Sequence, residues 1–240
     1  MKLAARIRWR HVRRFYEGAE PLLKASPVKL ACPDSGRVLV LAPHIDDDVI
    51  GAGGCLRKHV ELGNDVAAVY FADCTAERIR EAEEAAGAIG FSILDFFPYE
   101  GKTLDGNSGV EERISSIISG YKPEIVYLPS FLDRHNDHLA VNHCLARLHV
   151  GHGYTFTVYA YEVWTAIIPN LVVDITGTID KKKEALSGYG SQLPAHDWVE
   201  AAVSLNRFRG VTSGAGLFAE AFMRYSMGEY FDLWKKVYSG

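Results

Sequence analysis

The sequence lacks the features that mark several large classes of protein. Its 240 residues include only four cysteines, and no two of them form a C-x-x-C pair. They therefore predict neither a disulfide framework nor a thiolate zinc site, and a reducing, cytoplasmic location is expected. Apolar runs fall well short of the roughly 18 residues that span a bilayer, so we expect no transmembrane helix.

An excess of positive charge is also missing. The formal net charge is -4 at pH 7, which gives no overall basic field for a nucleic-acid partner. Arginines interrupt the apolar residues at the N-terminus, a pattern unlike the continuous apolar core of a signal peptide. Residues 1–25 instead predict a basic helix. Association of this helix with an anionic membrane is one interpretation, but packing of its imperfect apolar stripe on the protein is the one we favour.

The chain has no G-x-G-x-x-G motif, no internal repeat and no Pro/Ser-rich linker. Its glycine run, 51–54, falls inside a helical pattern and follows an acidic cluster that would repel a pyrophosphate. We therefore predict no nucleotide cofactor. The simplest organisation is one domain over 1–240, with residues 1–30 as an N-terminal helical extension.

Four β-α units follow one another in the first two thirds of the chain. Strands are predicted at 37–42, 66–72, 93–97 and 125–129, and helices at 49–62, 75–89, 110–120 and 139–149. This alternation predicts a parallel sheet with helices on both faces. Later runs at 154–164 and 170–174 predict strands at an antiparallel edge, 179–189 predicts a helix, and 198–208 and 216–227 are amphipathic. The predicted fold is α/β: a Rossmann-like three-layer α/β/α architecture with a mostly parallel sheet and an antiparallel C-terminal edge.

Two clusters of imidazoles and carboxylates come directly after strands of this sheet. The first is HIDDD at 44–48, and the second is HNDH at 135–138. If the strands at 37–42 and 125–129 are neighbours, as in a Rossmann sheet, both clusters meet at the topological switch point. Nitrogen and carboxylate ligands without cysteine suit zinc, and other divalent first-row metals are compatible with them. A spare Asp can take a proton from water and a spare His can stabilise an oxyanion, so the clusters favour metal-assisted hydrolysis of an amide or an ester.

Each cluster also has a structural interpretation. Asp48 is a natural N-cap for the helix that follows it, and R-H-N-D-H alone fits a polar surface loop. Only the placement of both clusters at strand ends favours a site. The remaining histidines, His196 among them, lack such placement, and the aromatic segment 154–164 fits either a substrate wall or an oligomer interface.

The two clusters resemble the signatures of a known family. H-x-D-D-D-V-I-G-A-G-G at 44–54 is similar to the H-P-D-D-E-x-x-G-x-G-G signature of the PIG-L/LmbE-like de-N-acetylases, and R-H-N-D-H is similar to their second motif, H-P-D-H. A weaker similarity extends over 174–192. The resemblance implies a Rossmann-like fold and a zinc-dependent hydrolase. Its expected reaction is removal of an N-acetyl group from an N-acetylated amino sugar or an N-acetylglucosamine conjugate.

Carried over by position, the resemblance implies a role for each matching residue. Three residues would bind the metal: His44, Asp47 and His138. Asp46 would be the general base that activates water. His135, oriented by Asp137, would stabilise the oxyanion.

The resemblance further implies that Arg78 and Glu100 contact the substrate. Three positions depart from the family pattern: Ile45 and Asn136 replace the prolines of the two motifs, and Asp48 replaces a longer Glu. None of these changes removes a ligand or the base, but they leave the individual sugar unspecified. The expected partner is a small N-acetylated sugar, and a homo-oligomer is compatible with the sequence. The alternative is a non-catalytic metal- or sugar-binding module of the same fold.

Overall fold

A computed structural model describes residues 9–19, 26–192 and 196–238 of the chain. Its strands form a single eight-stranded sheet in the order β1-β7-β8-β6-β5-β2-β3-β4. The strands are β1 (Val28–Leu30), β2 (Val38–Ala42), β3 (Val66–Ala72), β4 (Ser92–Tyr99), β5 (Ile125–Pro129), β6 (Thr157–Tyr161), β7 (Leu171–Asp174) and β8 (Ala219–Ser226).

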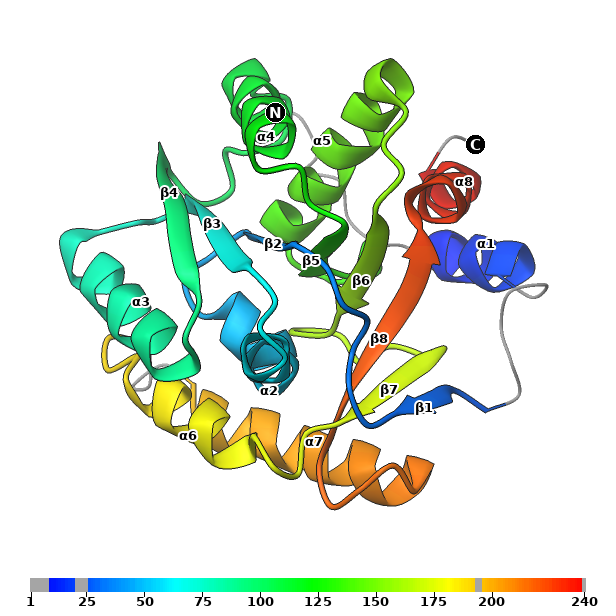
Figure 1. Cartoon of the computed structure of the whole chain (residues 1–240). Helices are drawn as coiled ribbons and strands as arrows, with labels where there is room; N and C mark the ends of the chain where they lie inside the picture. The colour runs from blue at the N-terminus through cyan, green and yellow to red at the C-terminus, as the bar shows by residue number, and fades with distance from the viewer. Residues whose placement is uncertain (1–8, 20–25, 193–195, 239–240) are drawn as a thin grey trace.

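Helices cover both faces of the sheet, as Figure 1 shows. One face carries α2 (Asp47–Glu61), α3 (Ala76–Ile89), α6 (Ile179–Ser187) and α7 (Trp198–Ser213). The other carries α1 (Trp9–Ala19), α4 (Ser108–Tyr121), α5 (Asn136–His152) and α8 (Met227–Tyr238). The predicted three-layer α/β fold with a mostly parallel sheet is confirmed.

The centre of the sheet has the predicted strand order. β2 pairs in parallel with β3 on one side and with β5 on the other. After β4 the chain therefore returns to the opposite side of β2 to add β5, and this reversal is the topological switch point. Both strands are buried at every residue, which explains their unbroken apolar sequences. Parallel pairing places the carboxyl ends of β2 and β5 side by side, and the two polar clusters follow those ends.

The antiparallel pairing lies in the C-terminal part of the sheet, but one strand supplies it. β8 runs antiparallel to both β6 and β7 and lies between them. The segments expected at an antiparallel edge, 154–164 and 170–174, contain β6 and β7, and both strands pair antiparallel with β8; β6 is also parallel to β5. The sequence pattern of 216–227, which contains β8, was only amphipathic. α8, which follows β8 directly, has no counterpart in the prediction. α5 begins at Asn136, so the second polar cluster extends into its first turn.

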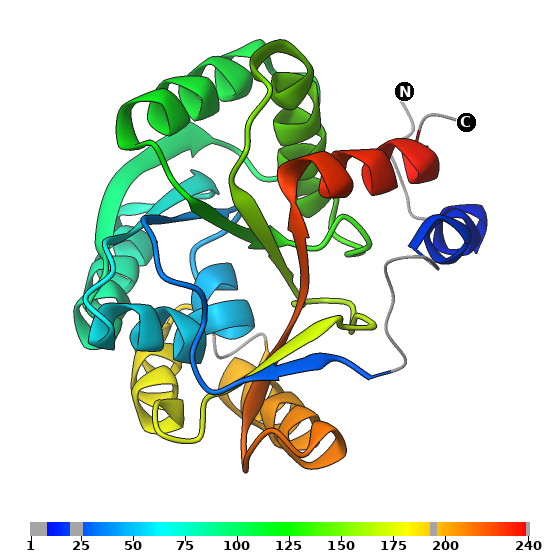
Figure 2. The same cartoon turned by 45° about the vertical axis from the view of Figure 1, so that its right-hand side comes forward.

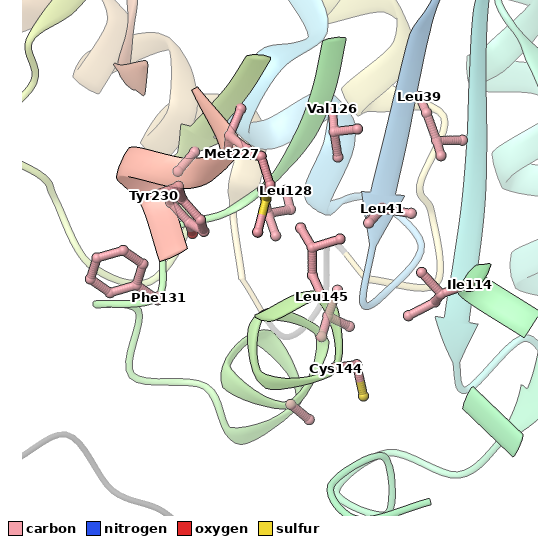
Figure 3. Packing of buried hydrophobic residues seen from close by; sticks show 14 of the residues in the cluster. Leu39, Leu41, Ile114, Val126, Leu128, Phe131, Cys144, Leu145, Met227 and Tyr230 are labelled. Atoms are coloured by element: carbon pink, nitrogen blue, oxygen red, sulfur yellow. The ribbon is translucent and has the colours of Figure 1, made fainter. Parts of the chain in front are cut away.

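The hydrophobic core consists of two main layers, one on each side of the sheet. Leu39 and Leu41 of β2 point into the layer beneath α4, α5 and α8, whereas Val38 and Val40 point into the layer beneath α2, α3 and α6. The two-residue period of a strand produces this division. Figure 3 shows the first layer, where residues of β2 and β5 meet side chains from the helices: Ile114, Cys144, Leu145, Met227 and Tyr230.

The N-terminal helix packs on the protein by its apolar side. α1 lies beside α8 in both views (Figures 1 and 2), and the ring of Phe15 is buried in the first core layer, 5.8 Å from the ring of Phe131. This agrees with the packing interpretation of the basic helix. The predicted helical residues 1–8 and 20–25 lie outside the described part of the chain. Among the described helices, none combines the length and apolarity needed to cross a membrane.

Candidate active site

Three histidine rings meet where β2 and β5 end. His44 follows β2, and His135 and His138 lie at the start of α5, after β5. The ring centroids are 4.6 Å apart for His44 and His135, 5.0 Å for His135 and His138, and 5.6 Å for His44 and His138. One ring nitrogen of each lies within 4.8 Å of the others. The structure thus brings together the two clusters that the sequence separates by three crossovers.

Asp47 lies between two of these rings. Its Oδ2 is 3.2 Å from Nδ1 of His44 and 3.1 Å from Nε2 of His138, and it accepts a hydrogen bond of 2.9 Å from the backbone N–H of His44. Burial alone would raise the pKa of Asp47, but the charges of His138 and His44, together with the hydrogen bond from His44, hold it well below its usual range. Asp47 is therefore a carboxylate.

The His138 ring is buried and has free ring nitrogens. Asp47 Oδ2 lies 3.1 Å from its Nε2 and Asp133 Oδ2 lies 3.5 Å from its Nδ1, but neither pair has the alignment of a hydrogen bond. Unsatisfied polar atoms in a dry interior are costly, so most are paired. A metal ion would bind the lone pair of Nε2, next to the Asp47 carboxylate. Asp133, next to Nδ1, has the position of a carboxylate that supports the ring.

The donor set fits a divalent first-row metal. Zinc–ligand bonds of about 2.0–2.2 Å in a tetrahedron separate neighbouring ligand atoms by about 3.3 Å. Asp47 Oδ2 lies near this distance from ring nitrogens of both His44 and His138. Two sets of three ligands are compatible with the structure: the three histidines, or His44 and His138 with Asp47.

The hydrogen bonding of His135 distinguishes these two sets. Its Nδ1 accepts a hydrogen bond of 3.3 Å from the backbone N–H of Asp137. A neutral imidazole with Nδ1 as acceptor carries its proton on Nε2. The pKa of His135 is lowered, chiefly by burial and then by the neighbouring imidazoles, so the neutral form is favoured. The Nε2–H of His135 is therefore available as a hydrogen-bond donor and has no lone pair for a metal. This favours Asp47, and not His135, as the third metal ligand.

Asp46 occupies a strained position in front of α2. It is the N-cap residue, with φ of 115°, in the left-handed region that residues other than glycine rarely adopt. Its side chain makes no capping hydrogen bond. Burial raises its pKa well above the usual range, and the charge of Asp47 raises it further. Strain of this kind costs about 1–3 kcal/mol and concentrates at functional sites.

Asp48 does not cap α2, because Asp46 holds that position. Asp48 lies inside the first turn, where it is fully buried. Its Oδ2 accepts a hydrogen bond of 2.7 Å from the hydroxyl of Tyr70 on β3. The residue that replaces the family's Glu therefore braces the loop against the neighbouring strand.

Asp137 lies closer to His44 than to His135, the histidine that it was expected to orient. Its Oδ2 is 3.1 Å from Nε2 of His44 but 3.8 Å from Nδ1 of His135. Both carboxylate oxygens also accept the backbone N–H of Lys102, at 2.8 Å. Asp137 therefore ties the loop after β4 to the site. The sequence could not reveal Lys102, because a main-chain donor leaves no signal in residue type.

Arg78 lies near the site, on the first turn of α3. Its Nη2 donates to Oε1 of Gln192 at 2.8 Å, and its charge lowers the pKa of Asp46 in partial opposition to burial. Glu81, one turn later, accepts hydrogen bonds from Ser191, which ties α3 to the 191–192 segment. Glu100 is exposed after β4, and within the described residues its carboxylate forms no hydrogen bond or ion pair.

Asp133 is a residue of the site that the sequence did not reveal. It is fully buried, its Oδ1 accepts the backbone N–H of His135 at 3.1 Å, and its Oδ2 accepts that of Trp164 at 2.9 Å. It thereby joins the loop after β5 to the loop after β6. An Asp two residues before a polar motif is an ordinary turn residue in sequence, so only the fold shows what it holds.

The family model described as PIG-L: GlcNAc-PI de-N-acetylase matches residues 39–149, which include both clusters. This match supports the resemblance of the chain to the PIG-L/LmbE-like family. It is 24% identical over 217 residues to the diacetylchitobiose deacetylase of Thermococcus kodakarensis, covering 77% of this chain and 81% of that protein.

Two solved structures show how the fold is shared. The N,N′-diacetylchitobiose deacetylase of Pyrococcus horikoshii, in complex with an inhibitor, superposes with a TM-score of 0.69 at 22% identity, over 82% of this chain and 86% of that one. The hydratase GalB of Pseudomonas putida superposes with a TM-score of 0.64 at 22% identity, over 78% and 95% of the two chains. Because deacetylation and hydration occur on this one fold, the reaction has to be inferred from the site.

Proposed function

We propose that this protein is a metal-dependent hydrolase that removes an N-acetyl group from an N-acetylated amino sugar or an N-acetylglucosamine conjugate. The observation that carries the proposal is the position of Asp47 between His44 and His138, with the strained, buried Asp46 beside it. The match to the family model and the name of the Thermococcus relative support the N-acetylated sugar as substrate.

His44, Asp47 and His138 would hold the metal, which we take to be zinc. Bound there, zinc polarises the amide carbonyl and lowers the pKa of water. Asp137 forms a hydrogen bond with Nε2 of His44, and Asp133 Oδ2 lies 3.5 Å from Nδ1 of His138. These carboxylates fix the orientation of the rings and raise their basicity as ligands.

Asp46 is the proposed general base. Its carboxylate takes a proton from the water that attacks the amide carbon, and the carbonyl oxygen becomes an oxyanion. His135 donates its Nε2 proton in a hydrogen bond to that oxygen. As the C–N bond breaks, Asp46 returns the proton to the amine nitrogen, so acetate and a free amino sugar leave. A carboxyl group of raised proton affinity suits both transfers.

Arg78 and Glu100 are the proposed sugar contacts. Gln192 holds the guanidinium of Arg78 at one edge, which leaves its other N–H groups available for hydroxyls. Glu100 lies exposed at the end of β4, on the same edge of the sheet as the metal ligands. Both follow strands on the β3–β4 side of the site.

Release of acetate tests the proposal. Zinc-loaded protein should release acetate and a primary amine in equal amounts from N-acetylglucosamine or N,N′-diacetylchitobiose, and a chelator should abolish both products. An Asp46→Asn variant that keeps its zinc should be nearly inactive. The absence of acetate from every N-acetylated sugar tried would overturn the proposal. Zinc binding without turnover would then support the binding-module alternative.

A further inference from the structure

A group of aromatic rings lies beside His135, outside the catalytic cluster. The indole of Trp164 is 6.3 Å from the His135 ring, centroid to centroid, and their planes are 25° apart. The rings of Trp198 and His196 meet Trp164 at steep angles, with centroids 4.9 and 5.3 Å away. None of these three rings takes part in the proposed deacetylation mechanism.

Trp164 is held at a fixed place relative to the catalytic rings. Its backbone N–H donates to Asp133 Oδ2 at 2.9 Å, and its carbonyl accepts from Nη2 of Arg134 at 3.3 Å. Asp133 also holds the backbone of His135 and faces the ring of His138. The buried carboxylate of Asp133 therefore holds both the catalytic loop and the backbone of Trp164 in place.

Packing of the protein interior does not account for Trp164. Its side chain is only half-buried, and it belongs to none of the hydrophobic core clusters of the described residues. Among those residues its indole N–H also has no hydrogen-bond partner. A large ring with an apolar face and a free donor, fixed next to an active site, is suited to a ligand that has both apolar and polar groups.

Trp198 connects this surface to the acidic loop. It begins α7, and it lines a cavity of about 130 Å³ together with Ile50 and Gly51 of α2. Ile50 lies one turn after Asp46, and its backbone N–H donates to the Asp46 carbonyl. Trp164 and Trp198 thus form one aromatic surface, which lies on the β6 side of the catalytic residues.

The strand order places Arg78 and Trp164 on opposite sides of the catalytic clusters. Arg78 follows β3, the catalytic clusters follow β2 and β5, and Trp164 follows β6. Neighbouring strands lie about 4.8 Å apart, so the three spacings between β3 and β6 amount to about 14 Å. A sugar held on the Arg78 side of the site therefore leaves Trp164 to a group attached to that sugar.

We propose that Trp164, supported by Trp198, binds the second ring of a substrate in which the N-acetylated sugar is joined to a further sugar. Pyranose rings have a face of C–H groups that packs on an indole, and a neighbouring hydroxyl can accept the indole N–H. This inference rests on the proposed deacetylase function. It adds that the enzyme prefers a disaccharide or longer chain to a monosaccharide.

Paired kinetics test the inference. We would measure kcat and KM of the zinc-loaded full chain on N-acetylglucosamine and on N,N′-diacetylchitobiose. Trp164→Ala should lower kcat/KM about tenfold on the disaccharide, mainly through KM, because one aromatic contact is lost. On the monosaccharide it should change kcat/KM less than about twofold, and Trp164→Phe should restore most of the loss. Equal losses on both sugars, or none, would overturn the inference.

A control and a binding measurement separate this inference from the proposed function. Phe208→Ala removes an exposed aromatic ring on the same helix as Trp198 and should leave both sugars unaffected. If the parent releases no acetate from either sugar, the proposed function fails, and calorimetry with N,N′-diacetylchitobiose tests the surface alone. Binding by the parent that Trp164→Ala abolishes would support the surface, and no binding by the parent would overturn it.

Discussion

Asp47 and His138 meet across two separate β-α units, with Oδ2 of the carboxylate 3.1 Å from Nε2 of the ring. One residue opens α2 and the other lies in the first turn of α5. Their strands, β2 and β5, are neighbours in the sheet. The contact therefore depends on the switch in strand order, and any change that shifts α2 against α5 should reduce metal affinity and activity together.

The identity of the third ligand can be tested by a pair of variants. His135→Gln should keep one zinc per chain and lower kcat by about 10²–10³, since it removes an oxyanion donor. Asp47→Asn should weaken zinc binding severely. The measurements are zinc content after dialysis and steady-state kinetics. Loss of zinc from His135→Gln, with retention in Asp47→Asn, would instead support the three-histidine set.

Replacement of Asp46 by glycine should raise the stability of the protein and lower its activity. Glycine adopts its φ of 115° without strain, so Asp46→Gly should raise the free energy of unfolding of the metal-free protein by about 1–3 kcal/mol. The same change removes the proposed base, and kcat should fall by about 10²–10⁴. Urea unfolding and acetate release measure the two effects. A less stable glycine variant would contradict the strain assigned to this residue.

The glycines of α2 should be needed for close packing. A Cβ added at Gly51 would overlap the Tyr161 ring, so Gly51→Ala should displace α2 or unfold the protein. Gly87 on α3 is the matched control, since a Cβ there meets nothing within 4 Å. Gly87→Ala should stabilise the protein by about 0.5–1 kcal/mol. Thermal unfolding distinguishes the two variants, and equal effects would show that packing does not matter at Gly51.

A buried ion pair between Lys182 of α6 and Glu220 of β8 attaches α2 to both elements. Nζ of Lys182 donates to Glu220 at 2.6 Å and to the Ile50 carbonyl at 2.8 Å, and Glu220 accepts backbone N–H groups of Gly54 and Cys55. Lys182→Met leaves a buried, unpaired carboxylate and should cost about 3–5 kcal/mol of unfolding free energy.

The control for that pair is Lys181→Met, which breaks an exposed pair with Glu184 and should cost less than about 1 kcal/mol. Both variants are measured by urea denaturation. The double change Lys182→Met with Glu220→Gln should be less damaging than Lys182→Met alone. If the double variant is no better, the unpaired charge is not the cause of the loss.

His59 should make the protein sensitive to mild acid. The ring is buried against the Tyr127 hydroxyl, and burial lowers its pKa to about 4 from the ordinary 6.5. The unfolded chain therefore takes up a proton below pH 6.5 while the folded chain does not. This contribution to stability is full above pH 6.5 and should fall by about 3 kcal/mol as the pH drops to 4.

The test compares His59→Gln with the parent between pH 7 and pH 4.5, by urea unfolding of the metal-free protein. The difference between the two is informative, because the raised pKa values of His44, about 10, and His138, about 9, act in the opposite direction in both proteins. The variant should lose less stability on acidification. Identical pH profiles would show that His59 is not the group responsible.

The sequence by itself determined the centre of this protein. Runs such as 38–42, apolar on both faces, can only be strands covered on both sides, and the polar residues that follow them belong at one edge of a parallel sheet. The spacing of His44 and Asp47, within one turn of chain, was also fixed locally. For these reasons the strand order around β2, and the meeting of the two clusters, could be predicted.

The tertiary structure decided what depends on contacts between distant segments. β8 has the sequence of an amphipathic segment, and only its place between β6 and β7 makes it a buried antiparallel strand. Asp48 could cap a helix or brace a loop, and the hydroxyl of Tyr70 on the next strand selects the second. Asp133, the Lys102 backbone and Trp164 join the site through main-chain hydrogen bonds, which no pattern of residue types encodes.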